Sequence, residues 1–233
     1  MGKKWTWTLR IGVKDLAAME LEEHLDESSA AALPRRESLR LQRRQAIITV
    51  ATRSFLDHGY AATSMSSIAA AVGGSKGTLW SHFSSKDDLF SAVLEDRTEA
   101  FRRNLSAPLD PDNNLHDAIR SFCCQFIAKL ISPEAIALHR LVISECARFP
   151  QTGTIFYERA QLKTLRLMAS FLTLHMEKGG IRQCDAMMAA RTLMSLCSGG
   201  SQQEILRGAS YAVERIETDA DFIADVFMRA FTP

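Results

Sequence analysis

Two very short helical segments on either side of a glycine pair constrain the fold of this chain more than any other feature. The stretch from Thr63 to Phe83 reads TSMSSIAAAVGGSKGTLWSHF, and Gly73-Gly74 divides it into two apolar-periodic pieces. An isolated helix shorter than about 12–15 residues is marginal in water. Each piece therefore depends on the other, and on flanking helices, for its stability.

The remainder of the chain also predicts helices. No segment shows the sustained alternation of apolar and polar residues that a half-buried strand requires. Gly59 is expected to end the first helix, and Pro133 and Pro150 to mark helix boundaries. The expected helices cover about 37–58, 64–72, 76–83, 86–104, 115–131, 133–148, 154–178, 185–207 and 218–231.

The predicted fold is all-α, with an N-terminal three-helix head that carries a helix-turn-helix and a larger helical body. We expect a disordered N-terminal extension over 1–34, a helix-turn-helix domain over 35–94 and an all-helical effector-binding and dimerisation domain over 95–233. For the extension, a short helix over 13–25 and an over-long gene start stay open as alternatives.

The charge of the chain is unevenly distributed. Between Arg35 and Lys86 there are eight basic residues and two acidic ones, a net charge of +6. The whole chain carries only +1, so the remainder is acidic. Such asymmetry predicts an anionic partner for the basic part.

Cysteine and histidine spacing argues against several other classes of protein. The five cysteines include no CxxC pair, which favours reduced thiols in a cytoplasmic protein. The six histidines are never closer than 23 positions, so no helical metal pair exists, and no GxSxG, Walker or dinucleotide motif is present. We therefore expect no enzyme, no cofactor and no metal site. No apolar run is long enough to span a membrane.

The second short helix has an outward face of hydrogen-bond donors. Ile68, Val72, Leu79 and Phe83 have the spacing to pack inward against the first helix. The side chains that remain outside are mostly donors, which suits a helix in the major groove of DNA. They are Lys76, Thr78, Trp80, Ser81 and His82.

These residues carry a resemblance to a known family. The pattern TSMxxIAxxxGxSKGTLWxHFxxKxxL, from Thr63 to Leu89, resembles the DNA-binding signature of the TetR family of transcriptional regulators, over about 46–94. Two positions differ from the usual pattern. Gly74 stands where a branched apolar residue is common, and Trp80 replaces a tyrosine whose hydroxyl bonds phosphate, leaving an indole N–H as the donor.

The resemblance implies a set of DNA contacts. Thr63 or Ser64 would hold a phosphate at a helix N-terminus, where free backbone N–H groups also point, and Lys86 would hold another. Simple helix capping is the alternative for Thr63, Ser64 and Ser75, a core position for Trp80, and a solvated charge for Lys86. The full predicted set is Arg40, Arg43, Arg44, Thr63, Ser64, Ser75, Lys76, Gly77, Thr78, Trp80, Ser81, His82 and Lys86.

The resemblance also implies a ligand cavity and a dimer. His139 or His175 would orient a ligand, although most apolar candidates are equally compatible with plain core packing. The predicted lining residues are Phe122, Phe126, His139, Ile143, Cys146, Met168, Phe171 and His175. Helices 185–207 and 218–231 are expected to form a two-fold homodimer interface through two apolar stripes, with an internal core as the alternative. The stripes are Met187, Ala190, Met194 and Cys197, and Phe222, Val226 and Phe227.

The predicted function is a homodimeric, sequence-specific repressor, cytoplasmic and nucleoid-associated, that a small hydrophobic ligand releases from double-stranded operator DNA. An enzyme is the first competing class. A second is a related DNA-binding activator or architectural factor that takes no ligand. A third is a regulator that senses oxidants through Cys123, Cys124 or Cys146.

Overall fold

The computed structural model describes residues 35–73, 76–105, 108–110 and 112–233. The predicted extension over 1–34 lies outside these residues, as do Gly74 and Ser75. Every regular element in the described residues is a helix, as the sequence predicted. Residues 43–233 form one compact unit, and residues 35–42 of the first described helix belong to a separate one.

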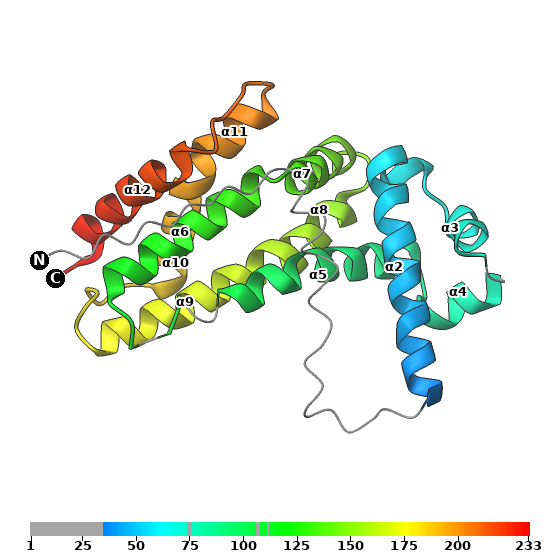
Figure 1. Ribbon diagram of the computed structural model, residues 1–233, viewed down its shortest axis with the longest axis horizontal. Helices are drawn as coiled ribbons and strands as arrows, with labels where there is room; N and C mark the ends of the chain where they lie inside the picture. Colours follow the sequence, from blue (N-terminus) through cyan, green and yellow to red (C-terminus); the bar gives the residue numbers. More distant parts are fainter. Residues whose placement is uncertain (1–34, 74–75, 106–107, 111) are drawn as a thin grey trace, which may run out of the picture. The chain divides into compact units, whose positions relative to one another are not determined.

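The helix-turn-helix region, defined here as α2 from Arg43 onward together with α3 and α4, follows the predicted order (Figure 1). Ile68, Leu79 and Phe83 are almost completely buried against α2, and Val72 is partly buried beside them, as expected from their spacing. The helices run over α2 Arg35–Ala62, α3 Met65–Val72 and α4 Lys76–His82.

Gly59 interrupts α2 four residues before Thr63. Its backbone lies at φ 83° and ψ 168°, outside helical geometry, yet helical hydrogen bonding continues to Ala62. A side chain here would bring its Cβ to 2.9 Å from Glu145 Oε1 of α7. The predicted stop is therefore a kink, which only glycine can occupy without strain.

An aromatic cluster fills the base of the helix-turn-helix region. Phe55 stacks on Tyr60 at 5.8 Å between ring centroids, and Phe90 of α5 contacts both rings edge-on at 5.1 and 5.3 Å. Phe149 approaches Tyr60 at 5.4 Å. This packing joins α2 to α5 and to the α7–α8 connection.

Side-chain caps begin the next three helices. These are α5 Lys86–Asn104, α6 Leu115–Ile131 and α7 Pro133–Glu145. Ser85, Asn114 and Ser132 accept hydrogen bonds from backbone N–H groups two or three residues into their helices. Pro133 occupies the first turn of α7, where its missing N–H costs nothing.

The predicted helix over 154–178 is part of a longer run. It begins at Pro150 and consists of α8 Pro150–Phe156, a π-helical turn η1 Tyr157–Gln161 and α9 Leu162–Glu177. Pro150 starts a helix rather than only ending one, because proline fits a first helical turn. α5 packs against both α8 and η1.

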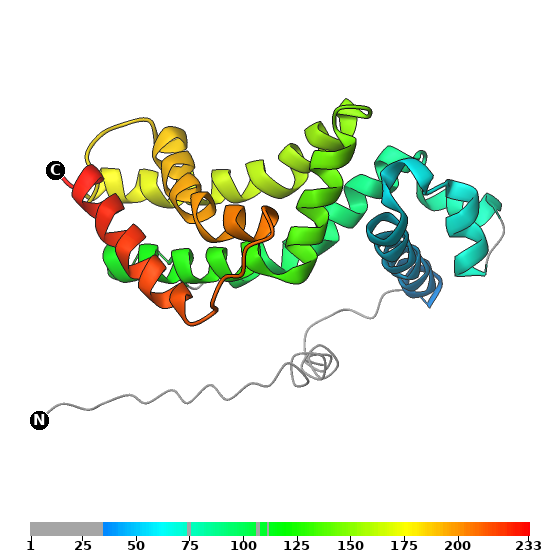
Figure 2. The same cartoon turned by 90° about the horizontal axis from the view of Figure 1, so that it is seen from above.

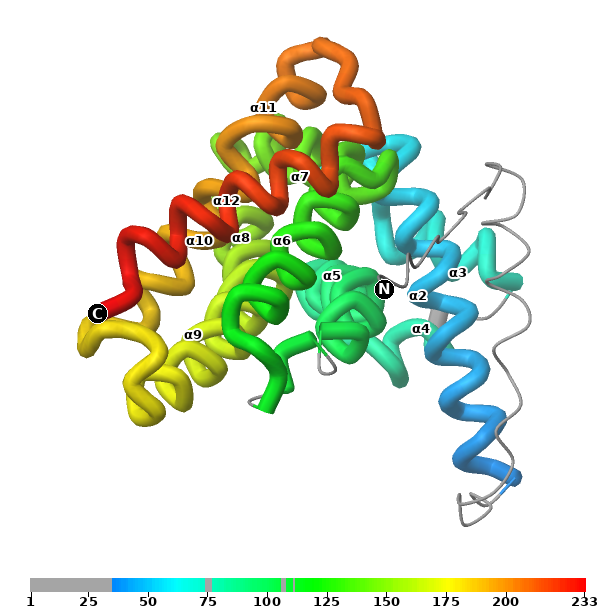
Figure 3. Tube along the Cα trace, turned by 60° about the vertical axis from the view of Figure 1, so that its left-hand side comes forward, coloured from blue at the N-terminus to red at the C-terminus, as the bar shows by residue number. Residues whose placement is uncertain are grey.

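The last three helices differ from the expected pair. They are α10 Ala186–Gly199, α11 Ser201–Leu206 and α12 Arg215–Phe231. Gly200, at φ −94° and ψ −95°, separates α10 from α11, so 185–207 is two helices. The chain then turns back over 207–214 and returns as α12 (Figures 2 and 3). α12 packs against both α6 and α10.

The two stripes predicted for the dimer interface face the chain's own core. Ala190, Cys197 and Phe227 are fully buried in the cluster formed by α6, α9, α10 and α12, and Met187 and Met194 pack against it. Apolar residues at helical spacing pack an internal core as readily as a partner subunit, so the spacing alone did not distinguish the two. Two members of the α12 stripe lie outside that cluster: Phe222, with 69% of its surface exposed, and Val226, which is half-buried.

Candidate DNA-binding surface and effector cavity

Local caps begin and end α3. Ser64 accepts a hydrogen bond from the Ser67 N–H at 3.0 Å, and Ser67 Oγ accepts from the Ser64 N–H at 3.1 Å. This reciprocal pair forms a capping box in which Ser67 fills the place usually taken by Glu. Gly73 ends α3 at φ 70° and ψ 38°, the left-handed conformation that its position predicted.

The outer face of α4 exposes part of the predicted recognition surface. Trp80 has 52% of its surface exposed, which excludes the alternative of a core aromatic. Gly77 and Ser81 are exposed, and Thr78 and His82 are half-buried. The Ser81 hydroxyl donates to the Thr78 carbonyl at 2.8 Å, and its lone pairs remain available outside.

Thr63 and Ser64 have different environments. Thr63 is 2% exposed, and its hydroxyl donates to the Gly59 and Ser54 carbonyls at 2.8 and 3.0 Å. A phosphate contact by the Thr63 side chain is therefore excluded, and the residue instead ties the kink of α2 to the start of α3. Ser64 is exposed and caps α3, so capping and a phosphate contact remain compatible there.

Lys86 has a structural role that the sequence did not reveal. Its ammonium donates to the Tyr60 and Thr63 carbonyls at 2.9 and 3.2 Å and lies 4.1 Å from the centre of the Tyr60 ring. Burial lowers the pKa of Lys86, which Asp87 and Glu145 oppose. Two of its three N–H donors are engaged at the end of α2, so at most one is left for a phosphate.

The predicted arginines of α2 lie toward its N-terminal half. Arg40, in the separate unit of residues 35–42, is exposed. Arg44 is also exposed and holds its guanidinium 5.0 Å from the Phe83 ring centre, and Arg43 is half-buried. The contact with Phe83 places Arg44 beside the C-terminal end of α4.

A cavity of about 400 Å³ lies among the helices that follow the helix-turn-helix region. Residues of α5, α6, α7, α8, η1, α9, α10 and α11 line it. Its lining is mainly apolar, with Phe101, Phe126, Leu130, Leu138 and Phe156 among the larger side chains. A cavity of this size and character suits a small organic molecule.

Two of the eight predicted ligand-binding residues line this cavity. They are Phe126 and His139. The His139 ring lies edge-on to Phe156 at 4.8 Å, and its Nδ1 is 3.3 Å from Nε2 of the buried Gln202. Burial lowers the pKa of His139, while a hydrogen bond with the backbone of Ala135 opposes this. His139 therefore presents a largely neutral ring at pH 7.

The other six predicted residues lie elsewhere. Phe122, Met168 and Phe171 are buried in the core of α6, α9, α10 and α12. Ile143 is exposed, and Cys146 is half-buried at the end of α7. His175 is buried near the end of α9 beside Phe171, with its Nε2 lacking a partner among the described residues.

The sequence reasoning missed the charged residues of the cavity. Arg97, Lys129, Glu134 and Arg191 all line it. A signal was present for Lys129, because it follows Phe126 by three residues in the run FCCQFIAKLI, where it is the one charged residue. A lone cation on the inward face of an amphipathic helix indicates a polar site rather than core.

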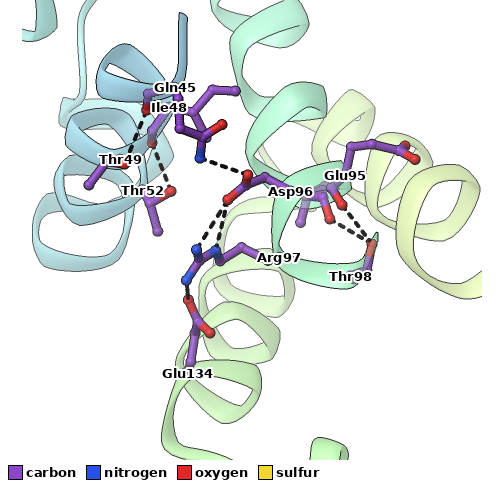
Figure 4. Close-up of polar contacts among 10 residues, drawn as sticks. Gln45, Ile48, Thr49, Thr52, Glu95, Asp96, Arg97, Thr98 and Glu134 are labelled. Atoms are coloured by element: carbon purple, nitrogen blue, oxygen red, sulfur yellow. Dashed lines mark hydrogen bonds and ion pairs between the residues drawn. The ribbon is translucent and has the colours of Figure 1, made fainter. Parts of the chain in front are cut away.

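A polar relay runs from the cavity to α2 (Figure 4). We use this name for Gln45, Asp96, Arg97 and Glu134. Arg97 Nη1 donates to Glu134 Oε1 at 2.8 Å and Nη2 to Asp96 Oδ2 at 3.1 Å, and Gln45 Nε2 donates to Asp96 Oδ1 at 2.8 Å. Burial lowers the pKa of Arg97, but these carboxylates outweigh it and raise the pKa. Arg97 and Glu134 line the cavity, and Gln45 belongs to α2.

One wall of the cavity is also part of the helix-turn-helix core. Leu138 of α7 and Phe156 of α8 line the cavity and belong to the buried cluster that contains Phe55, Ile68 and Phe83. A molecule in the cavity therefore contacts side chains that pack directly into that cluster.

Two of the three candidate redox cysteines, Cys123 and Cys124, are poorly placed for sensing oxidants, whereas Cys146 is half-buried at the end of α7 and stays a candidate. Cys123 and Cys197 are buried, and a contact with the Cys197 thiol together with burial raises the pKa of Cys123. Burial also raises the pKa of Cys124, although Arg120 opposes it. A raised pKa keeps the thiols of Cys123 and Cys124 protonated at neutral pH, so both react slowly with oxidants.

The described residues show neither a metal-ion cluster nor a membrane-spanning helix. Within the described ranges, no three histidine, cysteine or acidic residues gather in an arrangement that could hold a metal ion. No helix there has the length and apolar character needed to cross a bilayer.

Two family models match the chain. Residues 47–93 match the model described as bacterial regulatory proteins of the tetR family, and residues 117–233 match the C-terminal domain of AefR-like transcriptional repressors. The first coincides with α3, α4 and their flanking helices, and the second with most of the helices that line the cavity.

Known proteins resemble the chain over most of its length. The structure of the flavonoid-responsive regulator FrrA is 32% identical, with a TM-score of 0.73, and the match covers 82% of this chain and 98% of that one. A TetR-family regulator from Mesorhizobium loti is 26% identical, with a TM-score of 0.73 and coverages of 83% and 98%. The transcriptional repressor ComR of Escherichia coli is 26% identical over 162 residues, 68% of this chain and 77% of ComR.

Proposed function

Because the chain belongs to the TetR family of bacterial transcriptional regulators, we propose that it is a homodimeric repressor released from its operator by a small hydrophobic molecule. Members of the family are DNA-binding regulators and not enzymes, and this chain is one of them. The repressor role, the dimer and the release by ligand belong to the proposal.

The proposed DNA surface centres on α4. Its members are Lys76, Gly77, Thr78, Trp80, Ser81 and His82. The exposed indole of Trp80 supports this assignment, because 52% of its surface is accessible and its N–H can donate to a phosphate or a base edge. Ser64, Ser75, Arg40, Arg43 and Arg44 would contact the phosphate backbone on either side.

The proposed dimer uses the outer faces of α10 and α12. Met188 and Leu196 of α10 and Phe222 of α12 are large, apolar and exposed. Phe222 is kept from the predicted stripes, and Met188 and Leu196 replace the buried members of the stripe on α10 as proposed contact residues. Two-fold pairing of such faces would give an intersubunit four-helix bundle. The paired α4 helices would then read half-sites about 34–36 Å apart.

The shared wall of Leu138 and Phe156 carries the proposal of ligand control. An effector changes DNA affinity only if it binds the two conformations of the protein with different affinity. A molecule that displaces Leu138 or Phe156 must also disturb the packing of α2, α3 and α4. FrrA, the 32% identical relative, is by its name flavonoid-responsive, which supports control by a small organic molecule here.

Operator binding places the protein's site of action on the nucleoid, and hence in the cytoplasm. The experiment that tests the function is a footprint of the purified protein on the DNA upstream of its own gene. We expect a protected, two-fold symmetric site and a strong decrease in affinity with salt. Equal protection of unrelated DNA sequences would contradict the proposal of a specific operator. Activation of a reporter gene by the protein would show an activator instead of a repressor.

A further inference from the structure

The charges that line the cavity are unbalanced. Three cationic side chains, Arg97, Lys129 and Arg191, share the lining with a single carboxylate, Glu134. The remaining lining residues are apolar or neutral. The lining residues of the cavity therefore carry more positive charge than negative charge.

Glu134 is already occupied. Its Oε1 accepts a hydrogen bond from Arg97 Nη1 at 2.8 Å, and the same guanidinium is paired with Asp96 at 3.1 Å. Within the polar relay, the charges of Arg97 and Glu134 therefore compensate each other. Lys129 and Arg191 are the cations that remain.

Lys129 is in an unfavourable position for a lone ammonium. It is half-buried on α6, and among the described residues it makes no hydrogen bond and no ion pair. Burial lowers the pKa of Lys129, an effect that Glu134 opposes and Arg97 reinforces. A partly desolvated cation without an acceptor is costly, and a bound anion would remove that cost.

We propose that the effector is an amphipathic organic acid, whose anionic group pairs with Lys129 and whose apolar part lies among Phe101, Phe126 and Leu138. This inference rests on the proposed function, because it names the class of molecule that the regulator senses. Arg191, exposed on α10 at the same cavity, provides a second cation for the acid group.

An amine or a neutral molecule fits the same cavity less well. An amine would have to draw Glu134 away from Arg97, which would leave the guanidinium with one partner fewer. A neutral molecule would leave Lys129 without an acceptor. Only an acid improves the electrostatics of Lys129 without breaking the polar relay.

The experiment compares ligands that differ only in their polar group. Decanoate is compared with 1-decanol and decylamine, and 2-naphthoate with 2-naphthalenemethanol, by calorimetry on the full chain at pH 7.5. We expect each acid to bind at least about tenfold more tightly than its alcohol. Equal or tighter binding of the alcohols, tightest binding of decylamine, or binding of neither acid would overturn the proposal.

Variants test the role of Lys129 itself. K129Q is expected to reduce the preference for acid over alcohol to about threefold or less, and K129R to retain most of it. The matched control is K178Q, which removes a lysine charge at the end of α9, away from the cavity lining. An unchanged preference in K129Q would contradict the assignment. If K129Q does not fold, the comparison of ligands on the unmodified chain still decides the proposal.

The failure of this inference differs from the failure of the proposed function. A protein that protects an operator but is released only by the alcohols would keep the function and lose the acid effector. A protein that binds the acids through Lys129 but protects no operator would lose the function instead.

Discussion

The helix-turn-helix region and the cavity are built from opposite kinds of packing. Around α2, α3 and α4, the side chains of Phe55, Ile68, Phe83 and Phe90 are packed to near-complete burial. Phe156 also lines a cavity of about 400 Å³, whose lining includes four charged residues. A rigid α4 requires tight packing, whereas a ligand cavity requires unfilled space. The chain provides the two on opposite sides of one wall, which Leu138 and Phe156 form.

The largest expected effect comes from removing a ring on the tightly packed side. F90A should lower the free energy of unfolding by about 3–5 kcal/mol, because Phe90 contacts Phe55 and Tyr60 and no space exists to absorb the loss. F101A, on the cavity lining, should cost less than about 2 kcal/mol, because Phe101 is only partly buried. Urea denaturation of both variants measures the difference. Equal losses would show that the cavity side is as tightly packed as the other.

The next effect concerns DNA and leaves stability unchanged. W80A should weaken operator binding by about 1–3 kcal/mol, with the midpoint of thermal unfolding close to that of the unmodified protein. The exposed position of Trp80 is the reason for both expectations. F222A, which removes an even more exposed ring from α12, is the control for α4. It should shift the monomer–dimer equilibrium measured by sedimentation, whereas W80A should not.

A smaller effect is expected from breaking the polar relay between the two sides. Q45A removes the hydrogen bond to Asp96 and should reduce the coupling between ligand and DNA by about 0.5–2 kcal/mol. The measurement is the operator affinity with and without saturating decanoate or 2-naphthoate. T49A is the control, since the Thr49 hydroxyl donates to the Gln45 carbonyl within the same helix and does not contact Asp96 in the part of the chain that the structure describes. Identical coupling in both variants would leave the shared wall as the sole connection.

The smallest effect is a pH dependence on the cavity side. Because burial lowers the pKa of His139 and of His175, the folded chain favours their neutral forms. The stability associated with them is complete above the ordinary histidine pKa of about 6.5 and is lost as the pH falls through the lowered values. H139Q should therefore show a smaller decrease in unfolding temperature between pH 7 and pH 5. A decrease of the same size would assign the acid sensitivity to other groups.

The sequence predicted the helix-turn-helix region more completely than the cavity, for a physical reason. Ser64, Gly73 and the spacing of Ile68, Leu79 and Phe83 act over a few residues, so their roles are legible in a short stretch. Even there, the sequence predicted that Gly59 simply ends the helix, whereas it forms a kink. The burial of Thr63 and the contacts of Lys86 with backbone carbonyls depend on that kink.

The cavity depends on contacts between distant residues. Arg97 meets Glu134 across 37 positions, and His139 meets Gln202 across 63. Nothing in the local pattern distinguishes Phe126, which lines the cavity, from Phe122, which fills the core one turn earlier. The same ambiguity led the dimer prediction to choose the internal stripes of α10 and α12.

The π-helical turn at Tyr157–Gln161 has a consequence for how this architecture can change over time. Such a turn holds one residue more than an α-helical turn, and each residue of an α-helix accounts for about 100° of rotation. Phe156, just before the turn, is buried in the helix-turn-helix cluster, and Leu165, just after it in the same run of helices, is buried in the other core. Deletion of a single codon within this turn would rotate α8 relative to α9. The cavity and the helix-turn-helix region would then lose the packing that connects them.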